Sequence, residues 1–284
     1  MWKSYSDFSD RLGETAIQVM SPDMVSLFLA QLESEDKSYK TIRSYLSAIS
    51  FKFRLSNLAD PAHSMLVEKA IQGIKNKQLS GKPSQSRKPI DKPLLRKLLS
   101  AIPFTTSSVY DQAMFRAAFL LAHFACLRAG EISLSNNKEH LLTYDHFTRN
   151  STISGPSYTI KFSSYKHSNH QTPEITLLTS QDSELCSVTA LDHYLKFRGT
   201  FKGPLMQSPS GKALTRERFA QALKATLIFC KEQPDQYGTH SFRIGRATQL
   251  ADEHVADVTI RQSGRWNSNA FKAYIRPTSF IAPS

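Results

Sequence analysis

The chain has 284 residues, of which 40% are hydrophobic and 21% charged, a balance typical of a water-soluble globular protein with one large domain or two. No apolar run approaches the roughly 18 residues that a membrane-spanning helix needs, and the start of the chain lacks the pattern of a secretory signal peptide. The net charge of +12 favours a polyanionic partner such as DNA or RNA. A basic surface without a special partner is an equally open alternative.

The sequence contains no pattern that is typical of a metal site or of a cofactor site. Its three cysteines, Cys126, Cys186 and Cys230, have spacings that fit no zinc site. An odd number of widely spaced cysteines is typical of buried free thiols in a reducing compartment. We therefore expect an intracellular protein that works without a metal or a cofactor.

The first part of the chain, residues 1–78, predicts a small all-helical unit. Ser21 and Pro22 mark the start of a helix, because serine caps free backbone N–H groups and proline suits the first helical position. Apolar residues then recur at helical spacing. Two further helices are predicted over residues 39–55 and 65–74.

The helix predicted over residues 39–55 has one apolar face and one basic face. The basic face makes it the best candidate for an element that enters the major groove of DNA. The candidate contact residues on this face are Lys40, Arg43, Ser47 and Arg54. A solvated polar face is the alternative for each of them. Phe51 lies on the same face, which leaves open a second packing surface.

Residues 79–90 form the clearest linker. The stretch LSGKPSQSRKPI combines glycine, two prolines and three serines with basic residues, and it offers little to bury. It separates residues 1–78 from a second unit over residues 91–284. Its basic residues are candidates for contacts with a polyanion, and they are Lys82, Arg87 and Lys88.

The second unit is predicted to be mainly helical. Helices are expected over residues 91–102, 110–127, 187–198, 215–230 and 240–252. The helix over 110–127 is apolar on most of its circumference, and we therefore expect it in the centre of the core.

One small β element interrupts these helices. Apolar residues alternate with polar ones around Tyr158 and Ile160, and again around Ile175 and Leu177, which predicts a β-hairpin. Lys166 lies in the polar and basic tip between the two strands. The expected fold class is therefore mainly α with a small β-sheet or hairpin.

Five residues of the second unit have side chains that suit phosphate chemistry. They are Arg128, Lys166, His240, Arg243 and Tyr274. Each has an ordinary alternative when it is taken alone. Arg128, expected at the end of the helix over 110–127, would be favourable with the helix dipole. The lysine can be solvated, the histidine can start a helix, and the tyrosine can fill a core with its hydroxyl in water.

Taken together, these residues resemble the active-site motifs of the tyrosine recombinase family, also called phage-integrase-type recombinases. The family's first arginine is followed three residues on by an acid, as Arg128 is by Glu131. Its His-x-x-Arg motif matches His240 to Arg243. Its nucleophile is a tyrosine a short way beyond a Gly-His or Gly-Trp step, and Tyr274 follows the stretch Gly-Arg-Trp.

The resemblance covers the remaining motifs as well. The family's hairpin lysine matches Lys166. The stretches THSFRIGRAT, GRWNS and YIR are similar to the recombinase sequences of the eukaryotic branches of the family, such as DIRS-type retroelements and Crypton-like elements. This similarity implies a recombinase from a transposable element.

The resemblance implies a two-domain protein that grips duplex DNA as a C-shaped clamp. Residues 1–78 look like the family's N-terminal helical core-binding domain, which is SAM-like, and residues 91–284 look like its α+β catalytic domain. The basic linker, residues 79–90, would cross the DNA backbone. The implied partner is double-stranded DNA, bound by a homo-tetramer on synapsed sites and by a monomer or dimer when free. A eukaryotic source would place the protein in the nucleus, and no membrane is involved.

The resemblance also implies a role for each residue. Arg128 and Arg243 would hold the scissile phosphate, because a guanidinium is permanently charged and its planar fork matches phosphate. Tyr274 would attack the phosphorus and form a 3′-phosphotyrosyl bond, with His240 accepting or positioning the phenol proton. Lys166 would be the general acid for the departing 5′ oxygen. The covalent bond conserves the energy of the phosphodiester, so that neither ATP nor a metal is required.

Two features depart from the family pattern. The family's fifth catalytic position, a histidine or tryptophan, commonly lies nine residues before the tyrosine. Here Trp266 lies eight before Tyr274, and the ninth position is Arg265. Either Trp266 packs against the site or Arg265 takes the polar role, and we favour Trp266 because an indole can donate one N–H and buttress the tyrosine. The ten residues after Tyr274 include two prolines and suit poorly the C-terminal helix that many relatives pass to a neighbouring protomer.

Two other functions stay open at this point. One is a domesticated, catalytically silent DNA-binding module, although such a module is expected to have lost at least one of the five catalytic residues. The other is a type IB topoisomerase-like enzyme, which shares the tyrosine chemistry. The helical first unit and the wording THSFRIGRAT argue against the topoisomerase.

Overall fold

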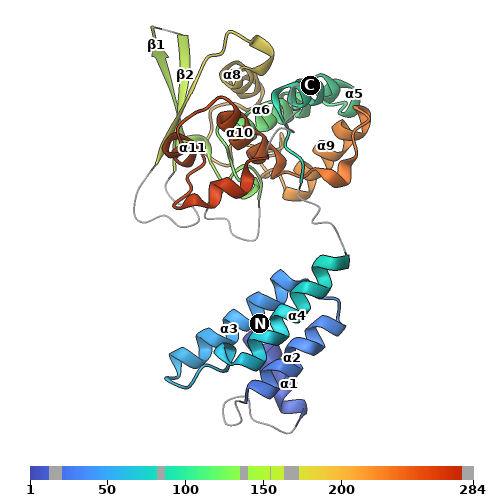
Figure 1. Cartoon of the computed structure of the whole chain (residues 1–284). Helices are drawn as coiled ribbons and strands as arrows, with labels where there is room; N and C mark the ends of the chain where they lie inside the picture. Colours follow the sequence, from blue (N-terminus) through green and yellow to red (C-terminus); the bar gives the residue numbers. More distant parts are fainter. Residues whose placement is uncertain (13–20, 82–86, 135–139, 154, 163–172, 277–284) are drawn as a thin grey trace, which may run out of the picture. The chain divides into compact units, whose positions relative to one another are not determined.

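The computed structural model describes residues 1–12, 21–81, 87–134, 140–153, 155–162 and 173–276 (Figure 1). These residues fall into two compact units, Met1–Gln85 and Ser86–Ser284. In the described ranges, no helix is both long and apolar enough to cross a bilayer.

The first unit is a helical bundle around an aromatic core. It consists of α1 (Trp2–Arg11), α2 (Pro22–Ser34), α3 (Tyr39–Leu55), the 3-10 turn η1 (Pro61–His63) and α4 (Met65–Gly81). Ser21 caps α2 as predicted, since its Oγ accepts a hydrogen bond from the N–H of Met24 at 3.2 Å. Helix α1 was not predicted. It closes the core because its Tyr5 meets Phe28 of α2, with 5.3 Å between ring centroids.

Helix α3 begins and ends at the predicted residues. Its apolar face, which includes Ile42, Ile49 and Phe53, is fully buried. Its opposite face is exposed and carries Lys40, Arg43, Ser47 and Arg54. Phe51 on that face is 64% exposed. The idea of a second packing surface on this face is therefore wrong for the described part of the unit.

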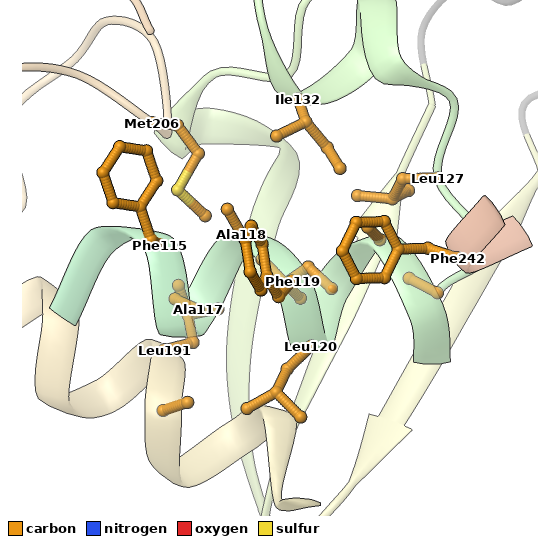
Figure 2. Packing of buried hydrophobic residues seen from close by; sticks show 14 of the residues in the cluster. Phe115, Ala117, Ala118, Phe119, Leu120, Leu127, Ile132, Leu191, Met206 and Phe242 are labelled. Atoms are coloured by element: carbon orange, nitrogen blue, oxygen red, sulfur yellow. The ribbon is translucent and has the colours of Figure 1, made fainter. Parts of the chain in front are cut away.

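The second unit is organised around α6 (Val109–Phe124), which is buried at almost every position from Ala113 to His123. It packs against α5 (Lys92–Thr105), α8 (Ser187–Arg198) and α10 (Ser241–Asp252). Figure 2 shows Phe119 of α6 beside Phe242 of α10, and Leu120 reaching toward α8. The prediction that this helix lies in the core is confirmed.

The predicted end of this helix, at Leu127, is wrong. Helix α6 stops at Phe124, and Cys126 has a left-handed backbone with a φ of 49°. The chain reverses there, which buries Leu127 in the core. Arg128 is therefore not a C-terminal helix cation. It is the N-cap residue of the short helix α7 (Ala129–Ile132).

The β element is a three-stranded antiparallel sheet with the order β1-β2-β3. Its strands are β1 (Phe147–Thr152), β2 (Gly155–Lys161) and β3 (Glu174–Leu178). The predicted hairpin is confirmed, because Ile160 of β2 pairs with Ile175 of β3 and Tyr158 pairs with Leu177. Strand β1, visible beside β2 in Figure 1, was not predicted. Of its residues only Phe147 is buried, so it carries no apolar alternation.

The remaining elements complete a mainly α fold with one small sheet, as predicted. They are η3 (Tyr144–His146), η4 (Ser183–Leu185), α9 (Arg216–Phe229), η5 (Pro234–Gln236), α11 (Asp257–Ser263) and η6 (Asn269–Tyr274). All three cysteines are free thiols, and Cys126 and Cys186 are buried, whereas Cys230 is partly exposed.

The segment around the predicted linker is partly structured. Helix α4 continues to Gly81. At the other end of the segment, the N–H of Lys88 donates to the carbonyl of Gln236 at 2.8 Å, and the N–H of Ile90 donates to the carbonyl of Ser241 at 3.0 Å. Residues 88–90 are therefore bonded to the second unit.

Candidate functional site

Helix α10 carries two of the candidate residues at its start. Its Phe242 packs against Phe119 of α6 and Phe219 of α9, with ring centroids 5.0 Å and 6.2 Å apart. Full burial of a phenylalanine side chain contributes about 1.5–3 kcal/mol, so this contact fixes the rotation of the helix. His240, the N-cap residue, and Arg243 then lie one turn apart and on the same side.

Arg243 is enclosed, with 1% of its surface exposed. Its two terminal amino groups donate to the carbonyls of Cys126 and Gly264. Its guanidinium carbon lies 4.1 Å from the ring centroid of Trp266 and 5.6 Å from that of Tyr274. The cation is thus held between two backbone dipoles and two aromatic faces.

Arg128 is more open, because 25% of its side chain is exposed. Its Nη1 donates to Oε1 of Glu131 at 3.0 Å, and its backbone N–H donates to Oε2 of the same carboxylate at 2.8 Å. Burial alone would raise the pKa of Glu131, but the charges of Arg265 and Arg128 outweigh burial and lower it. Glu131 is therefore an ionised carboxylate that orients Arg128.

Tyr274 ends the turn η6 and lies over the start of α10. Its ring centroid is 4.9 Å from that of His240 and 5.0 Å from that of Trp266. The position of its backbone is fixed by Thr248 of α10. The Oγ1 of Thr248 donates to the carbonyl of Tyr274 at 3.4 Å and accepts from the N–H of Arg276 at 3.0 Å.

His240 is neutral at physiological pH. Burial, followed by the charges of Arg243, Arg87, Arg128 and Arg216, lowers the pKa of His240 to about 4. A neutral imidazole can accept a proton, whereas an imidazolium cannot. The histidine beside the Tyr274 ring is therefore in the protonation state that a general base needs.

Arg265 and Trp266 occupy different environments although they are adjacent. The indole of Trp266 covers Arg243 and meets the ring of Tyr274. Its Nε1 is buried and has no hydrogen-bond partner in the described part of the chain. The guanidinium of Arg265 points away, into a buried ion pair with Glu131.

Comparison with known proteins identifies the fold. No family model and no curated protein matches the sequence. Among solved structures, XerH site-specific recombinase bound to difH substrate matches with a TM-score of 0.60 and 16% identity, covering 96% of this chain and 72% of that one. The Tn1549 transposon integrase in complex with transposon right end DNA matches with a TM-score of 0.64 and 14% identity, covering 98% and 87%. A lambda integrase dimer bound to a COC′ core site matches with a TM-score of 0.56 and 14% identity, covering 99% and 73%.

The chain has the tyrosine recombinase fold. Within this fold, the structure brings together most of the candidate catalytic residues predicted from the sequence. Arg243, Trp266, His240 and Tyr274 form one contiguous group, and Arg128 adjoins it through the carbonyl of Arg265, to which its Nη2 donates at 3.4 Å. Lys166 lies outside the described residues.

The candidate DNA contacts are distributed over both units of the tyrosine recombinase fold. Those of α3 belong to the first unit, and Lys82 lies outside the described residues. In the second unit, Lys88 and Arg87 are exposed. Arg87 is held beside the turn that leads to His240, where its guanidinium packs over Gly238 so closely that a Cβ there would lie 1.6 Å from Nη1.

Two basic residues near His240 were missed by the sequence analysis. A cavity of about 310 Å³ beside this turn is lined by Arg87, Arg216, Lys224 and Thr239, among others. Arg216 and Lys224 lie on α9, and Arg216 is close enough to lower the pKa of His240. The sequence does not distinguish these two residues from the other polar residues of α9. Only the fold shows that α9 lies beside the turn that leads to His240. Within the described ranges, no group of three histidine, cysteine or acidic residues could hold a metal.

Proposed function

We propose that the protein is a site-specific DNA recombinase that breaks and rejoins duplex DNA through a 3′-phosphotyrosyl intermediate. The observation that carries this proposal is the packing of the Tyr274 ring against neutral His240 and above the guanidinium of Arg243. A phenol beside a proton acceptor and a fixed cation suits attack on a phosphodiester. The folds of XerH site-specific recombinase and of the Tn1549 integrase, both solved with DNA, support the same conclusion.

In the proposed reaction, the phenol oxygen of Tyr274 attacks the phosphorus and the bond from phosphorus to the 5′ oxygen breaks. The phenol proton passes to His240, and Lys166 donates a proton to the departing 5′ oxygen. Arg128 and Arg243 stabilise the negative charge on the non-bridging oxygens. Attack by a 5′ hydroxyl on the phosphotyrosine then reseals a strand without ATP. The role of Lys166 rests on the resemblance alone.

The two arginines differ in access to this phosphate. Arg128 is partly exposed and can receive an oxygen directly. Arg243 is covered by Trp266 and Tyr274, so a phosphate reaches it only if these rings move. Loss of one positioned donor to a developing oxyanion costs about 3–4 kcal/mol of barrier height. Because each donor lowers the barrier by this much, we expect the reaction to need both arginines.

The proposed substrate is double-stranded DNA held by both units. The first unit acts as a core-binding domain through the exposed basic face of α3, and the second contacts the backbone through Arg87, Lys88 and the cations beside the His240 turn. A homo-tetramer on synapsed sites, an origin in a DIRS-type or Crypton-like mobile element, and a nuclear location are parts of the same proposal.

A covalent-capture experiment tests this function. The protein is incubated with a pool of nicked duplexes of randomised sequence, in which a cleaved fragment diffuses away and the covalent adduct accumulates. We expect an SDS-stable protein–DNA adduct, a modified Tyr274 by mass spectrometry, and no adduct with Tyr274→Phe. Sequencing of the captured DNA gives the target site.

Two further outcomes separate the alternative functions. DNA binding without any adduct would identify a catalytically silent binding module. A topoisomerase would form the adduct too, and a second assay identifies it by processive relaxation of a supercoiled plasmid without exchange of strands between sites.

A further inference from the structure

Arg265 and Glu131 form a buried ion pair at the edge of the proposed site. The Nη2 of Arg265 lies 2.6 Å from Oε2 of Glu131, and the two side chains are 1% and 2% exposed. Two charges can be buried so deeply only if they are paired and hydrogen-bonded. The pair must therefore remain closed in the folded protein.

The carboxylate of Glu131 binds two arginines, Arg265 and Arg128. Arg265 binds Oε2 of Glu131, which leaves Oε1 to accept from Nη1 of Arg128 at 3.0 Å. The backbone carbonyl of Arg265 accepts from the other amino group of Arg128, Nη2, at 3.4 Å. Arg265 thus acts on Arg128 twice, through its side chain by way of Glu131 and through its own carbonyl.

The guanidinium of Arg265 is enclosed, although its Nε has no hydrogen-bond partner among the described residues. Its guanidinium stacks on Phe162, with 3.9 Å between the guanidinium carbon and the ring centroid. Its Nη1 donates to the carbonyl of Ala125 at 3.4 Å. The residue has a left-handed backbone with a φ of 53°, a conformation that costs about 1–2 kcal/mol for a residue other than glycine.

We propose that Arg265 is a positioning residue for Arg128, which it holds through Glu131 and through its own carbonyl, and that it does not bind the scissile phosphate. This inference rests on the proposed function. Arg265, nine positions before Tyr274, thus has a charge that orients another side chain. Its neighbour Trp266 covers Arg243.

The charge balance explains why this arrangement helps the reaction. A carboxylate that is shared by two guanidinium groups neutralises only part of the positive charge of each. Without Arg265, Oε2 of Glu131 accepts from the backbone N–H of Arg128 and has room for its guanidinium as well, and a bidentate pair would turn that fork toward the acid. Arg128 would then offer the phosphate fewer donors and less net charge.

The test measures single-turnover cleavage at saturating DNA, with the duplex captured by the covalent assay as substrate. We expect Arg265→Gln to slow cleavage about 100-fold, the penalty of a reacting group misplaced by about 1 Å, with the Kd for DNA unchanged. Arg265→Gln with Glu131→Gln should be faster than Arg265→Gln alone, because the unpaired carboxylate is gone. Arg218→Gln is the matched control, since Arg218 pairs with Asp111 at 2.5 Å in the same unit, outside the site.

A second substrate distinguishes a positioning role from a general structural one. It carries a methyl group in place of one non-bridging oxygen of the scissile phosphate, so that the phosphate has no charge to hold. We expect Arg265→Gln and Arg128→Gln to slow cleavage of this substrate much less than cleavage of the ordinary one. Should Arg265→Gln fail to fold, Arg265→Lys and the double variant carry the same comparison.

The failures of the two proposals are distinguishable. If wild-type protein forms no adduct, the recombinase function is wrong, and the inference falls with it. If wild-type protein cleaves and Arg265→Gln cleaves equally well, or is slowed equally on both substrates, Arg265 does not position Arg128 and only the inference is overturned.

Discussion

Arg243 shows how a single charge can be kept ready in a protein core. It is surrounded by the carbonyls of Cys126 and Gly264 and by the faces of Trp266 and Tyr274. Neutral dipoles and aromatic faces stabilise a cation without cancelling its charge, whereas a carboxylate would cancel it. In the proposed reaction, a DNA phosphate would therefore meet a guanidinium that is not directly paired with a carboxylate among the described residues.

Buried His123 and half-buried His240 make the stability of the second unit depend on pH. Burial is the main cause that lowers the pKa of His123 and that of His240, each from the usual 6.5 to about 4. Above pH 6.5 both are neutral in the folded and unfolded states. As the pH falls from 6.5 toward 4, only the unfolded chain takes up protons, so the free energy of unfolding falls by up to about 1.4 kcal/mol per pH unit for each histidine.

Denaturant titrations between pH 4.5 and 7.5 would measure this loss. The variant His240→Gln should retain about half of the slope, which is the part due to His123. A wild-type stability that stays constant from pH 6.5 to 4.5 would show that neither histidine is held neutral in the folded protein.

At the scale of elements, two helix ends together build the pocket for Arg243. The left-handed residue Cys126 lies two positions after the end of helix α6, and the left-handed residue Arg265 lies two positions after the end of α11. Each reversal leaves a backbone carbonyl, that of Cys126 or of Gly264, turned toward Arg243. Left-handed residues after helices are usually glycine, so neither reversal could be predicted from the residue type.

Other elements were predictable because their signals are local. The capping residue Ser21 indicates the start of helix α2, and Asp91 indicates the start of helix α5. The Oδ1 of Asp91 accepts from the N–H of Leu94 at 2.8 Å. The pairing of β2 with β3 follows from apolar alternation. By contrast, the ion pair of Arg265 with Glu131 joins residues 134 positions apart, and no local pattern predicts it. The sequence left Trp266 and Arg265 as alternatives for one role, whereas the structure gives them separate surroundings.

Helix α10 lies directly on the backbone of the segment before α5. A Cβ on Gly245 would lie 1.8 Å from the carbonyl oxygen of Ile90. We expect Gly245→Ala to destabilise the second unit by about 1–3 kcal/mol, the typical cost of overpacking, because a backbone atom cannot turn aside. Chemical denaturation measures this change.

Gly73 in α4 is the control for this substitution. A Cβ there meets nothing within 4 Å, so Gly73→Ala should stabilise the first unit by about 0.5–1 kcal/mol through helix propensity. Equal effects at the two glycines would contradict a specific backbone contact at Gly245.

At the scale of the whole molecule, the chain shares its fold with XerH recombinase and the Tn1549 integrase at 14–16% identity, and it has a net charge of +12. The core positions that set the fold tolerate many apolar side chains, so the resemblance to the family was found in the order of a few motif residues, although no family model matches. Charge, in contrast, indicates the class of partner and not the residues that touch it.

The salt dependence of DNA binding would locate those residues. In a Tyr274→Phe background, Lys40→Gln and Arg43→Gln should each reduce the slope of log K against log salt by about 0.9, the release of the counterions of one phosphate. Arg54→Gln should have a smaller effect, since Arg54 already binds Ser50 at 2.6 Å and Asp60 at 3.3 Å.

Lys77→Gln is the matched control for these variants. Lys77 carries the same charge in the same unit but pairs with Glu33 at 3.0 Å, so its loss should leave the slope unchanged. If the variants of α3 bind DNA with the wild-type slope, the basic face of α3 is merely solvated.

The hydrogen bonds from Lys88 to Gln236 and from Ile90 to Ser241 have a mechanical consequence. They fasten the chain that arrives from the first unit to the turn on either side of His240, and Gly245 lets α10 lie against the same strip of backbone. A pull on this chain is therefore borne first by the loop that holds the histidine. Tension along this chain would therefore shift His240.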